Sequence, residues 1–242
     1  MKYLGSKARF AKEILPIMLR QRKVGQFYVE PFAGGMNCIC NVQGPAIAND
    51  VNPFLVAMWR ALQAGWVPPI VDRETYNKIR DNKSAFPAEL VGWVGFNCSY
   101  SGKFFGGFAG KVDTREGVRD YQEEARRNTL AQSAKLARCL FFCSDYQSLV
   151  IPQKSIVYCD PPYKGTTGYL NDIDHWSFWE WVRKLDKEGH VVFVSEYEAP
   201  HDFVCVWEKK ATSSLSANGK CGANKMSVER LYTMPMNDPF FN

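Results

Sequence analysis

Asp160, Pro161, Pro162 and Tyr163 directly follow an apolar run at 155–159. Two adjacent prolines fix the backbone φ angle and remove two N–H donors, so they predict a rigid turn after a buried strand. Such a turn would hold the Asp160 carboxylate, the Pro161 carbonyl and the Tyr163 ring together. Two acceptors beside an aromatic ring suit a planar base with an exocyclic amine, because the acceptors take the amine protons while the ring stacks on the base. Taken alone, the same four residues also fit a plain strand-end turn.

A second segment that could bind a ligand, Val29–Gly35, places two glycines after another apolar run. Glycine lets the backbone approach a ligand closely, and the N–H groups that open the following turn or helix can face that ligand. Asp50 lies about 20 residues further on, at the end of the next predicted strand, where a carboxylate can accept hydrogen bonds from both hydroxyls of a ribose. The alternative for Asp50 is a plain acid at a helix N-terminus.

Strands and helices alternate along most of the chain. Apolar runs predict strands at 27–29, 46–48, 139–143, 155–159, 190–195, 203–209 and 228–234. Helical spacing and cap signals predict helices at 7–22, 53–64, 74–82, 86–95, 116–137 and 175–187. The alternation indicates an α/β fold with a mainly parallel sheet, closed by an antiparallel hairpin of the last two strands. Ligands bind beyond the carboxyl ends of strands in such sheets, and both segments lie there.

Residues 65–135 differ from the rest of the chain because their helical patterns flank a segment rich in glycine and aromatic residues. This pattern predicts an inserted, mainly helical subdomain. The flanking parts, 1–64 and 136–242, would then form the sheet domain. The insertion contains a glycine- and aromatic-rich segment at 95–110, which fits a loop or hairpin. Its phenylalanines have two interpretations: they enter a groove of a nucleic acid, or they form the small core of the insertion. These residues are Phe104, Phe105 and Phe108.

Composition limits the class of protein. The 242 residues carry 30 Lys+Arg against 25 Asp+Glu, a net charge of +5, and 46% of them are hydrophobic. The chain is too apolar to be disordered, and no run of about 18 apolar residues could span a bilayer. Eight cysteines without a CxxC pair and only three histidines argue against a zinc site. No secretion signal opens the chain, so we expect a cytoplasmic protein, without membrane or metal.

The order of these segments resembles that of Dam-type DNA adenine-N6 methyltransferases of the alpha group, in the D12 class, and most closely their smaller phage- and prophage-encoded members. Tyr3–Lys7 is similar to the N-terminal segment of that family, Val29–Gly34 to its methionine-binding loop, and Phe142–Asp145 to the segment beside the cofactor adenine. Asp160–Tyr163 is similar to its catalytic tetrapeptide. The resemblance covers nearly the whole chain and implies a Rossmann-like class I S-adenosylmethionine-dependent methyltransferase sheet with an inserted target-recognition subdomain.

The resemblance implies roles for individual residues. The catalytic residues would be Asp160, Pro161 and Tyr163. The residues that would bind S-adenosylmethionine are Tyr3, Lys7, Glu30, Pro31, Phe32, Gly34, Asp50, Asp145 and Asp160. The residues that would contact DNA are Tyr100, Lys103, Lys111, Arg126, Lys164 and Tyr169. Arginines 115, 119, 126 and 127 fall on the predicted helix at 116–137 or just before it, where ion pairs with nearby glutamates compete with phosphate contact.

One position departs from the family pattern. The glycine loop often continues as Phe-x-Gly-x-Gly, and Met36 stands at the last of these glycines. A side chain there puts close backbone approach at residue 36 in question, while Gly34 and Gly35 keep the tightest part of the turn. We expect S-adenosylmethionine binding to be retained, at equal or lower affinity.

The resemblance implies methyl transfer from S-adenosylmethionine to the N6 amine of an adenine flipped out of double-stranded DNA, without a metal, a covalent intermediate or an obligatory protein partner. Three alternatives remain: adenine-N6 methylation of RNA, glutamine-amide methylation of a protein, and an inactive DNA-binding relative. Asp160 argues against the protein-modifying alternative, because those enzymes resemble Asn-Pro-Pro-Tyr at this turn. The intact Lys7, Asp50 and Asp-Pro-Pro-Tyr argue against the inactive relative.

Overall fold

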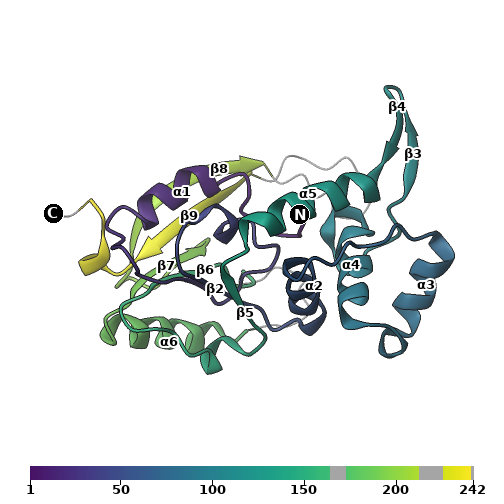
Figure 1. Ribbon diagram of the computed structural model, residues 1–242. Helices are drawn as coiled ribbons and strands as arrows, with labels where there is room; N and C mark the ends of the chain where they lie inside the picture. Colours follow the sequence, from purple (N-terminus) through teal and green to yellow (C-terminus); the bar gives the residue numbers. More distant parts are fainter. Residues whose placement is uncertain (164–172, 213–225, 241–242) are drawn as a thin grey trace. The chain divides into compact units, whose positions relative to one another are not determined.

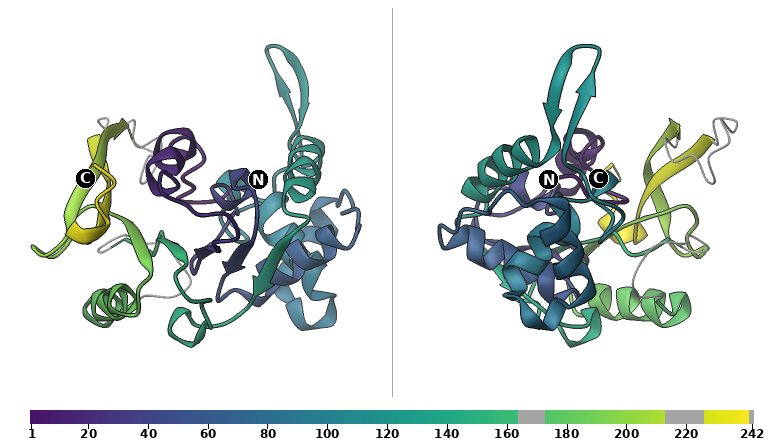
Figure 2. Two further views of the ribbon diagram at one scale, coloured as in Figure 1. Left: turned by 60° about the vertical axis from the view of Figure 1, so that its left-hand side comes forward. Right: turned by 90° about the vertical axis from the view of Figure 1, so that its right-hand side faces the viewer.

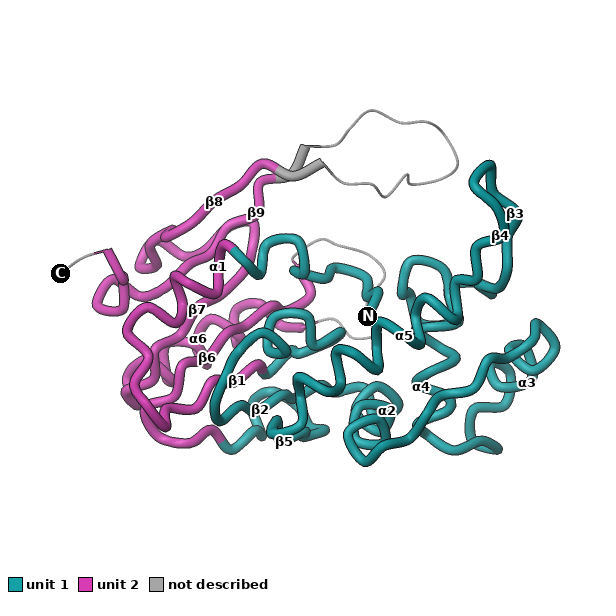
Figure 3. The backbone as a smooth tube through the Cα atoms, turned by 45° about the horizontal axis from the view of Figure 1, so that its top comes forward, with its two compact units in different colours: residues 1–12, 31–150 teal, residues 13–30, 151–242 magenta. Residues whose placement is uncertain are grey.

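The computed structural model describes residues 1–163, 173–212 and 226–240. The chain forms two compact units, shown in different colours in Figure 3. Unit 1 comprises residues 1–12 and 31–150, and unit 2 comprises residues 13–30 and 151–242. Each unit contains strands of the predicted sheet.

Unit 1 contains a pair of parallel strands, a hairpin and several helices. The parallel strands are β2 (Ala46–Asn49) and β5 (Cys139–Phe142). The helices are α2 (Pro53–Gln63), α3 (Arg73–Asp81), α4 (Ala88–Asn97) and α5 (Tyr121–Lys135). The antiparallel hairpin comprises β3 (Lys111–Thr114) and β4 (Gly117–Asp120).

Unit 2 contains five strands in the order β1-β6-β7-β9-β8 among its described residues. Their bounds are β1 (Tyr28–Glu30), β6 (Ile156–Cys159), β7 (Val191–Glu196), β8 (Val204–Thr212) and β9 (Met226–Thr233). The first three strands run parallel, and β9 runs antiparallel to both β7 and β8. Helix α1 (Ala11–Met18) precedes β1, and helix α6 (His175–Lys187) lies between β6 and β7 in the chain (Figure 1).

Outside the β3–β4 hairpin, the strands follow the apolar runs of the sequence. Every residue of β1, β2 and β6 is buried, as expected for strands of a parallel sheet that is covered on both faces. Every predicted strand is present, with bounds that differ by a few residues, and the last two strands form the predicted antiparallel hairpin. The predicted α/β, Rossmann-like class is therefore confirmed.

The helix predicted at 7–22 is too long. Helix α1 covers only Ala11–Met18 and contains Pro16, which has no N–H to donate to the preceding turn. Before the helix, the chain forms a turn in which the Phe10 N–H donates to the Lys7 carbonyl at 2.9 Å. The apolar periodicity thus extends further than the helical hydrogen bonds do.

The helix predicted at 116–137 is wrong at its N-terminal end, because α5 begins only at Tyr121. Asp120 caps the helix: its carboxylate accepts hydrogen bonds from the backbone N–H groups of Gln122 and Glu123 at 3.1 and 3.0 Å. An aspartate cap of this kind starts a helix and separates it from the preceding backbone.

The residues before this cap form the β3–β4 hairpin. The Thr114 hydroxyl donates to the Gly117 carbonyl at 2.7 Å, and Gly117 has a φ angle of 111°, a value that favours glycine and excludes a helix. All residues from 111 to 119 are exposed, and Figures 1 and 2 show the hairpin projecting from the helices of unit 1. Arg115 and Arg119 therefore lie on the hairpin rather than on a helix.

The phenylalanines of the glycine-rich segment pack inside unit 1. The ring of Phe104 lies 4.8 Å from that of Phe96, centroid to centroid. The rings of Phe105 and Phe108 each lie 5.5 Å from that of Tyr76 on α3. These contacts favour the interpretation of a small aromatic core over direct entry into a groove.

The predicted insertion, residues 65–135, lies wholly within unit 1, where its helix α4 packs against α2. Gly92 makes this approach possible, since a Cβ atom there would lie 2.1 Å from the Phe54 carbonyl oxygen. The boundaries of the insertion as a separate subdomain stay a prediction.

In the described part of the chain, no helix has both the length and the apolar character needed to cross a membrane. No group of three or more His, Cys, Asp or Glu side chains in that part could hold a metal ion.

Candidate active site

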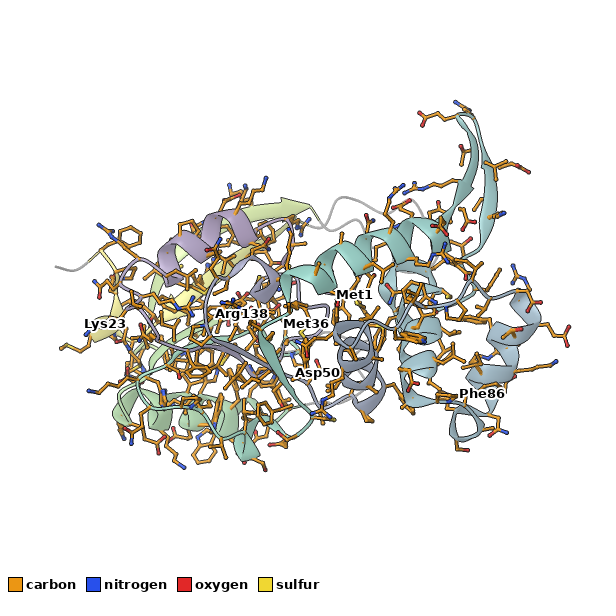
Figure 4. The ribbon with its side chains drawn as sticks, in the orientation of Figure 1. Met1, Lys23, Met36, Asp50, Phe86 and Arg138 are labelled. Carbon is orange, nitrogen blue, oxygen red and sulfur yellow. The ribbon has the colours of Figure 1, made fainter. Side chains whose placement is uncertain are left out.

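Asp50, labelled in Figure 4, directly follows β2. Both oxygens of its carboxylate accept hydrogen bonds from the backbone. Oδ2 accepts the N–H of Gly34 at 2.9 Å, and Oδ1 accepts the N–H of Asn52 at 2.9 Å. Asp50 is only 9% exposed, and burial raises the pKa of its carboxyl group above the ordinary value. A carboxylate has about four lone-pair sites, so Asp50 can accept two further hydroxyl donors.

The glycine loop, residues 31–36, forms a tight turn that is bound to β2. The Ala33 N–H donates to the Asn49 carbonyl at 2.8 Å. Gly34 has a φ angle of 48°, and a Cβ atom on it would lie 2.7 Å from the ring of Tyr3. Glycine is required here on both grounds, because the left-handed backbone is strained for other residues and the Tyr3 ring leaves no space.

Met36 adopts the left-handed conformation at the position where the resembling family has glycine. Its φ angle is 57°, its side chain is fully buried, and its N–H closes the turn by donating to the Ala33 carbonyl at 2.8 Å. This conformation costs a non-glycine residue about 1–2 kcal/mol, whereas burial of a methionine side chain stabilises by about 1.5–3 kcal/mol. Burial therefore offsets the strain, and the turn keeps a glycine-like backbone.

Asn49, the last residue of β2, joins three segments of unit 1. Its amide nitrogen donates to the carbonyls of Pro31 and Ser144 at 3.0 and 2.9 Å, and its Oδ1 accepts the N–H and the hydroxyl of Ser144 at 3.1 and 3.0 Å. Asn49 thereby positions both the glycine loop and the segment that leads to Asp145. Sequence reasoning missed this role, although an amide at the end of a buried strand was a visible signal.

Gln132 of α5 supports the same loop from the predicted insertion. Its Nε2 donates to the Gly35 carbonyl at 2.8 Å, and its Oε1 accepts the α-amino group of Met1. Gln132 and Gly35 are 97 positions apart, and no local pattern predicts the contact. The hydrogen bond links the loop to the helix that follows the hairpin.

Replacing Gln132 with leucine is expected to weaken S-adenosylmethionine binding about three- to tenfold, because the Gly35 carbonyl loses a hydrogen bond worth about 0.5–1.5 kcal/mol. Calorimetric titration measures the dissociation constant. The matched control is Gln63→Leu on α2, since the Gln63 amide donates to two carbonyls outside the loop, those of Leu136 and Cys139. The control should lower the melting temperature without changing Kd, and an unchanged Kd for Gln132→Leu would contradict the prediction.

Tyr3 and Lys7 are the two cofactor-binding candidates near the N-terminus. The ring of Tyr3 packs against the loop and lies 5.4 Å from that of Phe96. Lys7 is buried, and its ammonium group donates to the Gly5 carbonyl at 3.4 Å. The contacts described for Tyr3 are packing contacts, and its role in cofactor binding stays a prediction.

The candidates Pro31, Phe32 and Asp145 also lie in unit 1. Pro31 is buried, and the ring of Phe32 lies 5.0 Å from that of Tyr146. The neighbouring Asp145 is exposed, and its carboxylate accepts the N–H of Gln147 at 2.9 Å. Asn49 holds this segment against the end of β2, so unit 1 brings together the glycine loop, Asp50 and the residues before Asp145.

Glu30 and Asp160 lie at the carboxyl ends of β1 and β6, which are neighbouring parallel strands of unit 2. Glu30 is buried and accepts a hydrogen bond from the Tyr28 hydroxyl at 3.0 Å. Burial raises the pKa of the Cys159 thiol, and the charges of Asp160 and then Glu30 raise it further. Both carboxylates therefore lie close enough to the buried Cys159 thiol to raise its pKa.

The ring of Tyr163 is held by two residues of unit 2. Its hydroxyl donates to Oε2 of Glu229 on β9 at 3.0 Å, and its ring lies 4.6 Å from that of Tyr197 at an interplanar angle of 81°. Tyr163 is 7% exposed. Burial, followed by the charges of Asp160 and Glu229, raises the pKa of its phenol well above the usual value, so the hydroxyl stays protonated. Sequence reasoning missed both Glu229 and Tyr197.

Three DNA-binding candidates occupy exposed positions of unit 1. Tyr100 and Lys103 lie in and directly after a short 3₁₀ turn, and both are exposed. Lys111 lies on β3 with 71% of its side chain exposed, and its ammonium group is 3.8 Å from the Asp120 carboxylate. Exposed lysines such as these can approach a phosphate.

Arg126 differs from these residues. It lies on α5 and pairs with Glu123, three positions earlier, at 2.6 Å. The intrahelical ion pair that was predicted to compete with phosphate contact is therefore present. The remaining candidates, Lys164 and Tyr169, lie outside the described residues.

Comparison with known protein families defines the class of this chain. The family model for the D12 class N6 adenine-specific DNA methyltransferases matches residues 3–234. The chain belongs to this family of enzymes. This finding confirms the resemblance that rests on the glycine loop, Asp50 and the Asp160–Tyr163 turn.

Individual relatives are distant. The chain is 24% identical over 225 residues to the Type II methyltransferase M.FokI of Planomicrobium okeanokoites, an alignment that covers 79% of this chain and 33% of that protein. It is 26% identical over 231 residues to the retron Ec67 DNA adenine methylase of Escherichia coli, which covers 81% of this chain and 75% of that protein. The chain thus spans a third of the length of the first relative and three quarters of the second.

Among solved structures, the chain is similar to SMU.472, a putative methyltransferase complexed with SAH. The superposition has a TM-score of 0.37 and 12% sequence identity, and it covers 96% of this chain and 54% of that chain.

Proposed function

We propose that this chain transfers a methyl group from S-adenosylmethionine to the N6 amine of an adenine flipped out of double-stranded DNA. The observation that carries the proposal is the Asp160–Tyr163 turn, which directly follows β6 in a chain of the D12 class. The turn offers a carboxylate and a carbonyl to an amine, and an aromatic ring to a base. Family membership supports adenine in DNA as the substrate.

The glycine loop and Asp50 fit S-adenosylmethionine by their chemistry. When bound, this cofactor supplies a methyl group that the positive charge on sulfur makes electrophilic. Asp50 has acceptor sites for the ribose hydroxyls, and its carboxylate holds the glycine loop through the N–H of Gly34. The residues that would hold the cofactor are Tyr3, Lys7, Glu30, Pro31, Phe32, Gly34, Asp50, Asp145 and Asp160.

The catalytic turn would activate a poor nucleophile. The lone pair of the adenine amine is delocalised into the ring, so the amine nitrogen is nearly planar. Hydrogen bonds to the Asp160 carboxylate and the Pro161 carbonyl favour a pyramidal nitrogen whose lone pair is available for attack in line with the departing sulfur. Stacking on Tyr163, worth about 1–3 kcal/mol, holds the base. Catalysis then rests on positioning and electrostatics.

The exposed cations of unit 1 support DNA as the partner. The β3–β4 hairpin presents Lys111 and Arg115 on an exposed ribbon, whereas Arg119 pairs with Glu124 at 2.7 Å. A two-stranded ribbon fits the major groove of a duplex. The insertion at 65–135 would then be the target-recognition subdomain. The amine to be methylated lies inside the base stack, so the adenine must be flipped out of the duplex.

Replacing Lys103 with alanine is expected to weaken DNA binding and to lower the slope of log K against log salt by about 0.9, the value for one lost phosphate contact. Lys103 is exposed and has no ion-pair partner among the described residues. The matched control is Arg126→Ala, which removes a cation that Glu123 already neutralises, so affinity and slope should change little. Fluorescence anisotropy at several salt concentrations measures both, and equal slopes for the Lys103 variant and wild type would argue against phosphate contact.

Such an enzyme would act in the cytoplasm of a bacterium or a phage-infected cell, because its DNA substrate is there. It would need no protein partner for the transfer itself. An origin in a phage or prophage is part of the same proposal.

The test is transfer of tritiated methyl groups from S-adenosylmethionine to unmethylated duplex DNA, to RNA and to a protein extract, in parallel. The expected result is label in duplex DNA, with N6-methyladenine at one sequence context in nanopore reads of DNA from expressing cells. The Asp160→Ala variant serves as the inactive control. Label in RNA alone, label in protein alone, or no label in any substrate would overturn the proposal.

A further inference from the structure

We propose that Glu229 and Tyr197 are positioning residues that hold the Tyr163 ring in the one orientation in which it can stack on the target base. The inference rests on the proposed function, in which Tyr163 carries the flipped adenine. It deepens that function by naming the residues that determine where the base plane lies.

The first contact is at the far end of the Tyr163 side chain. Its hydroxyl donates to Oε2 of Glu229 at 3.0 Å, and both residues are 7% exposed. A tyrosine ring turns about two side-chain torsions, so a hydrogen bond at the para position fixes the direction of the whole ring. Because the hydroxyl donates its proton to the Glu229 carboxylate, the aromatic ring is the part of Tyr163 that can contact a substrate.

The second contact fixes the tilt of the ring. Tyr163 and Tyr197 meet in a T-shaped arrangement with centroids 4.6 Å apart at 81°. Such an arrangement is favoured by the charge distribution of aromatic rings, so it resists rotation of either ring. The hydrogen bond and the ring contact together define both the direction and the plane of Tyr163.

Tyr197 can hold the Tyr163 ring in place because hydrogen bonds fix the backbone of Tyr197. Its N–H donates to Oε1 of Glu196 at 2.8 Å. Its carbonyl accepts Nη1 of Arg230 at 2.5 Å and the hydroxyl of Tyr232 at 3.2 Å, both from β9. Glu229 lies on the same strand. Glu229 is thus part of β9, and Tyr197 is hydrogen-bonded to β9, so this strand supports both residues that contact Tyr163. Strand β9 in turn pairs with β7.

A carboxylate is a costly residue to bury, and packing alone does not require one. An apolar residue of similar size at position 229, combined with phenylalanine at 163, would fill the same space without a polar pair, and such double replacements are close to neutral for stability. The buried Tyr163–Glu229 pair therefore has a better explanation in orientation than in stability.

A double-mutant cycle tests the inference with Tyr163→Phe, Glu229→Leu and the double variant, assayed on unmethylated DNA at saturating S-adenosylmethionine. Each single replacement is expected to lower kcat about tenfold, because it removes one hydrogen bond to a charged group. The double variant should be no slower than the slower single variant, since both act through the same bond. Glu229→Gln keeps an acceptor oxygen and should remain within about threefold of wild type, while KM for DNA stays within about twofold throughout.

A second measurement does not depend on turnover. Once the methylated site is mapped, 2-aminopurine at the target position reports base stacking, because stacking on an aromatic ring quenches its emission. Tyr163→Ala should raise the emission of the bound complex, and Glu229→Leu should raise it towards the same level. Glu229→Gln should leave the emission at the wild-type level. A residue with only a structural role would lower the melting temperature and leave the emission unchanged.

The outcomes separate the two levels of the proposal. Additive losses in the cycle, or wild-type emission for Glu229→Leu, would overturn the positioning role while the proposed function stands. If Glu229→Leu does not fold, Tyr163→Phe and Glu229→Gln carry the test, and wild-type kcat for Tyr163→Phe would overturn the role. A wild-type protein that methylates no DNA overturns the proposed function itself.

Discussion

Replacing Asp160 with alanine is expected to lower kcat for methyl transfer about 10²- to 10³-fold while the protein stays folded. The variant loses the charged acceptor that would make the adenine amine nucleophilic, and removal of one preorganised electrostatic contact typically costs this much. Asp160 is half-buried at the end of β6, so its truncation leaves no large internal cavity. Tritium transfer to DNA measures kcat, and thermal melting by circular dichroism checks the fold.

Two further variants separate charge from shape. Asp160→Asn keeps an oxygen acceptor without the charge, so its kcat should lie between those of wild type and Asp160→Ala. Glu198→Ala removes an exposed carboxylate of the same unit and should leave kcat unchanged. An Asp160→Ala enzyme that kept a third of wild-type turnover would remove Asp160 from the mechanism.

Replacing Asp50 with alanine is expected to weaken S-adenosylmethionine binding by at least about 100-fold. Two hydrogen bonds from ribose hydroxyls to a carboxylate are worth about 1.5–3 kcal/mol each, and about 1.4 kcal/mol is a factor of ten in affinity. The same carboxylate also holds the N–H groups of Gly34 and Asn52, so the variant should lose stability as well. Calorimetry measures the affinity and thermal melting measures the stability.

Asp120→Ala is the matched control for the structural part of this effect. The Asp120 carboxylate also accepts two backbone N–H groups, at the start of α5. Its removal should lower the melting temperature without changing Kd for S-adenosylmethionine. If Asp50→Ala bound the cofactor as tightly as wild type, the ribose assignment would be wrong.

The Asp50 contact also has a pH dependence. Burial raises the pKa of its carboxyl group, and a protonated carboxyl offers fewer acceptor sites to the ribose hydroxyls. Affinity should therefore be complete above the raised pKa and fall as the pH drops through it, at a higher pH than for an ordinary aspartate. The Asp50→Asn variant should bind weakly and lose this dependence.

The sequence was sufficient for the elements whose signals are local. The apolar runs located every strand outside the β3–β4 hairpin, and the helix predicted at 53–64 is α2, where the Oδ1 of Asn52 accepts the N–H groups of Phe54 and Leu55 at 3.0 and 3.1 Å. Caps and strand runs involve neighbours within a few residues, so their energetics are visible in short windows of sequence.

Local signals were misleading where two of them competed. The charged and apolar residues from 116 onward continue the helical spacing of α5, but Gly117 and the Asp120 cap separate a hairpin from the helix. At Met36, the side chain suggested a departure from the glycine pattern, yet burial offsets the strain of a left-handed backbone. The start of α5 depends on the helix cap at Asp120, and the backbone at Met36 depends on the burial of its side chain. Residue types alone do not reveal how strong these contributions are.

The sequence by itself determined which chemical groups stand at the strand ends: Asp50 after β2, and Asp160 with its prolines and Tyr163 after β6. Only the tertiary structure decided which residues hold those groups in place. Gln132 reaches the Gly35 carbonyl across 97 positions, and Glu229 reaches the Tyr163 hydroxyl across 66. The physical reason is range, because strand and cap preferences act between near neighbours, whereas supporting contacts form where packing brings distant segments together.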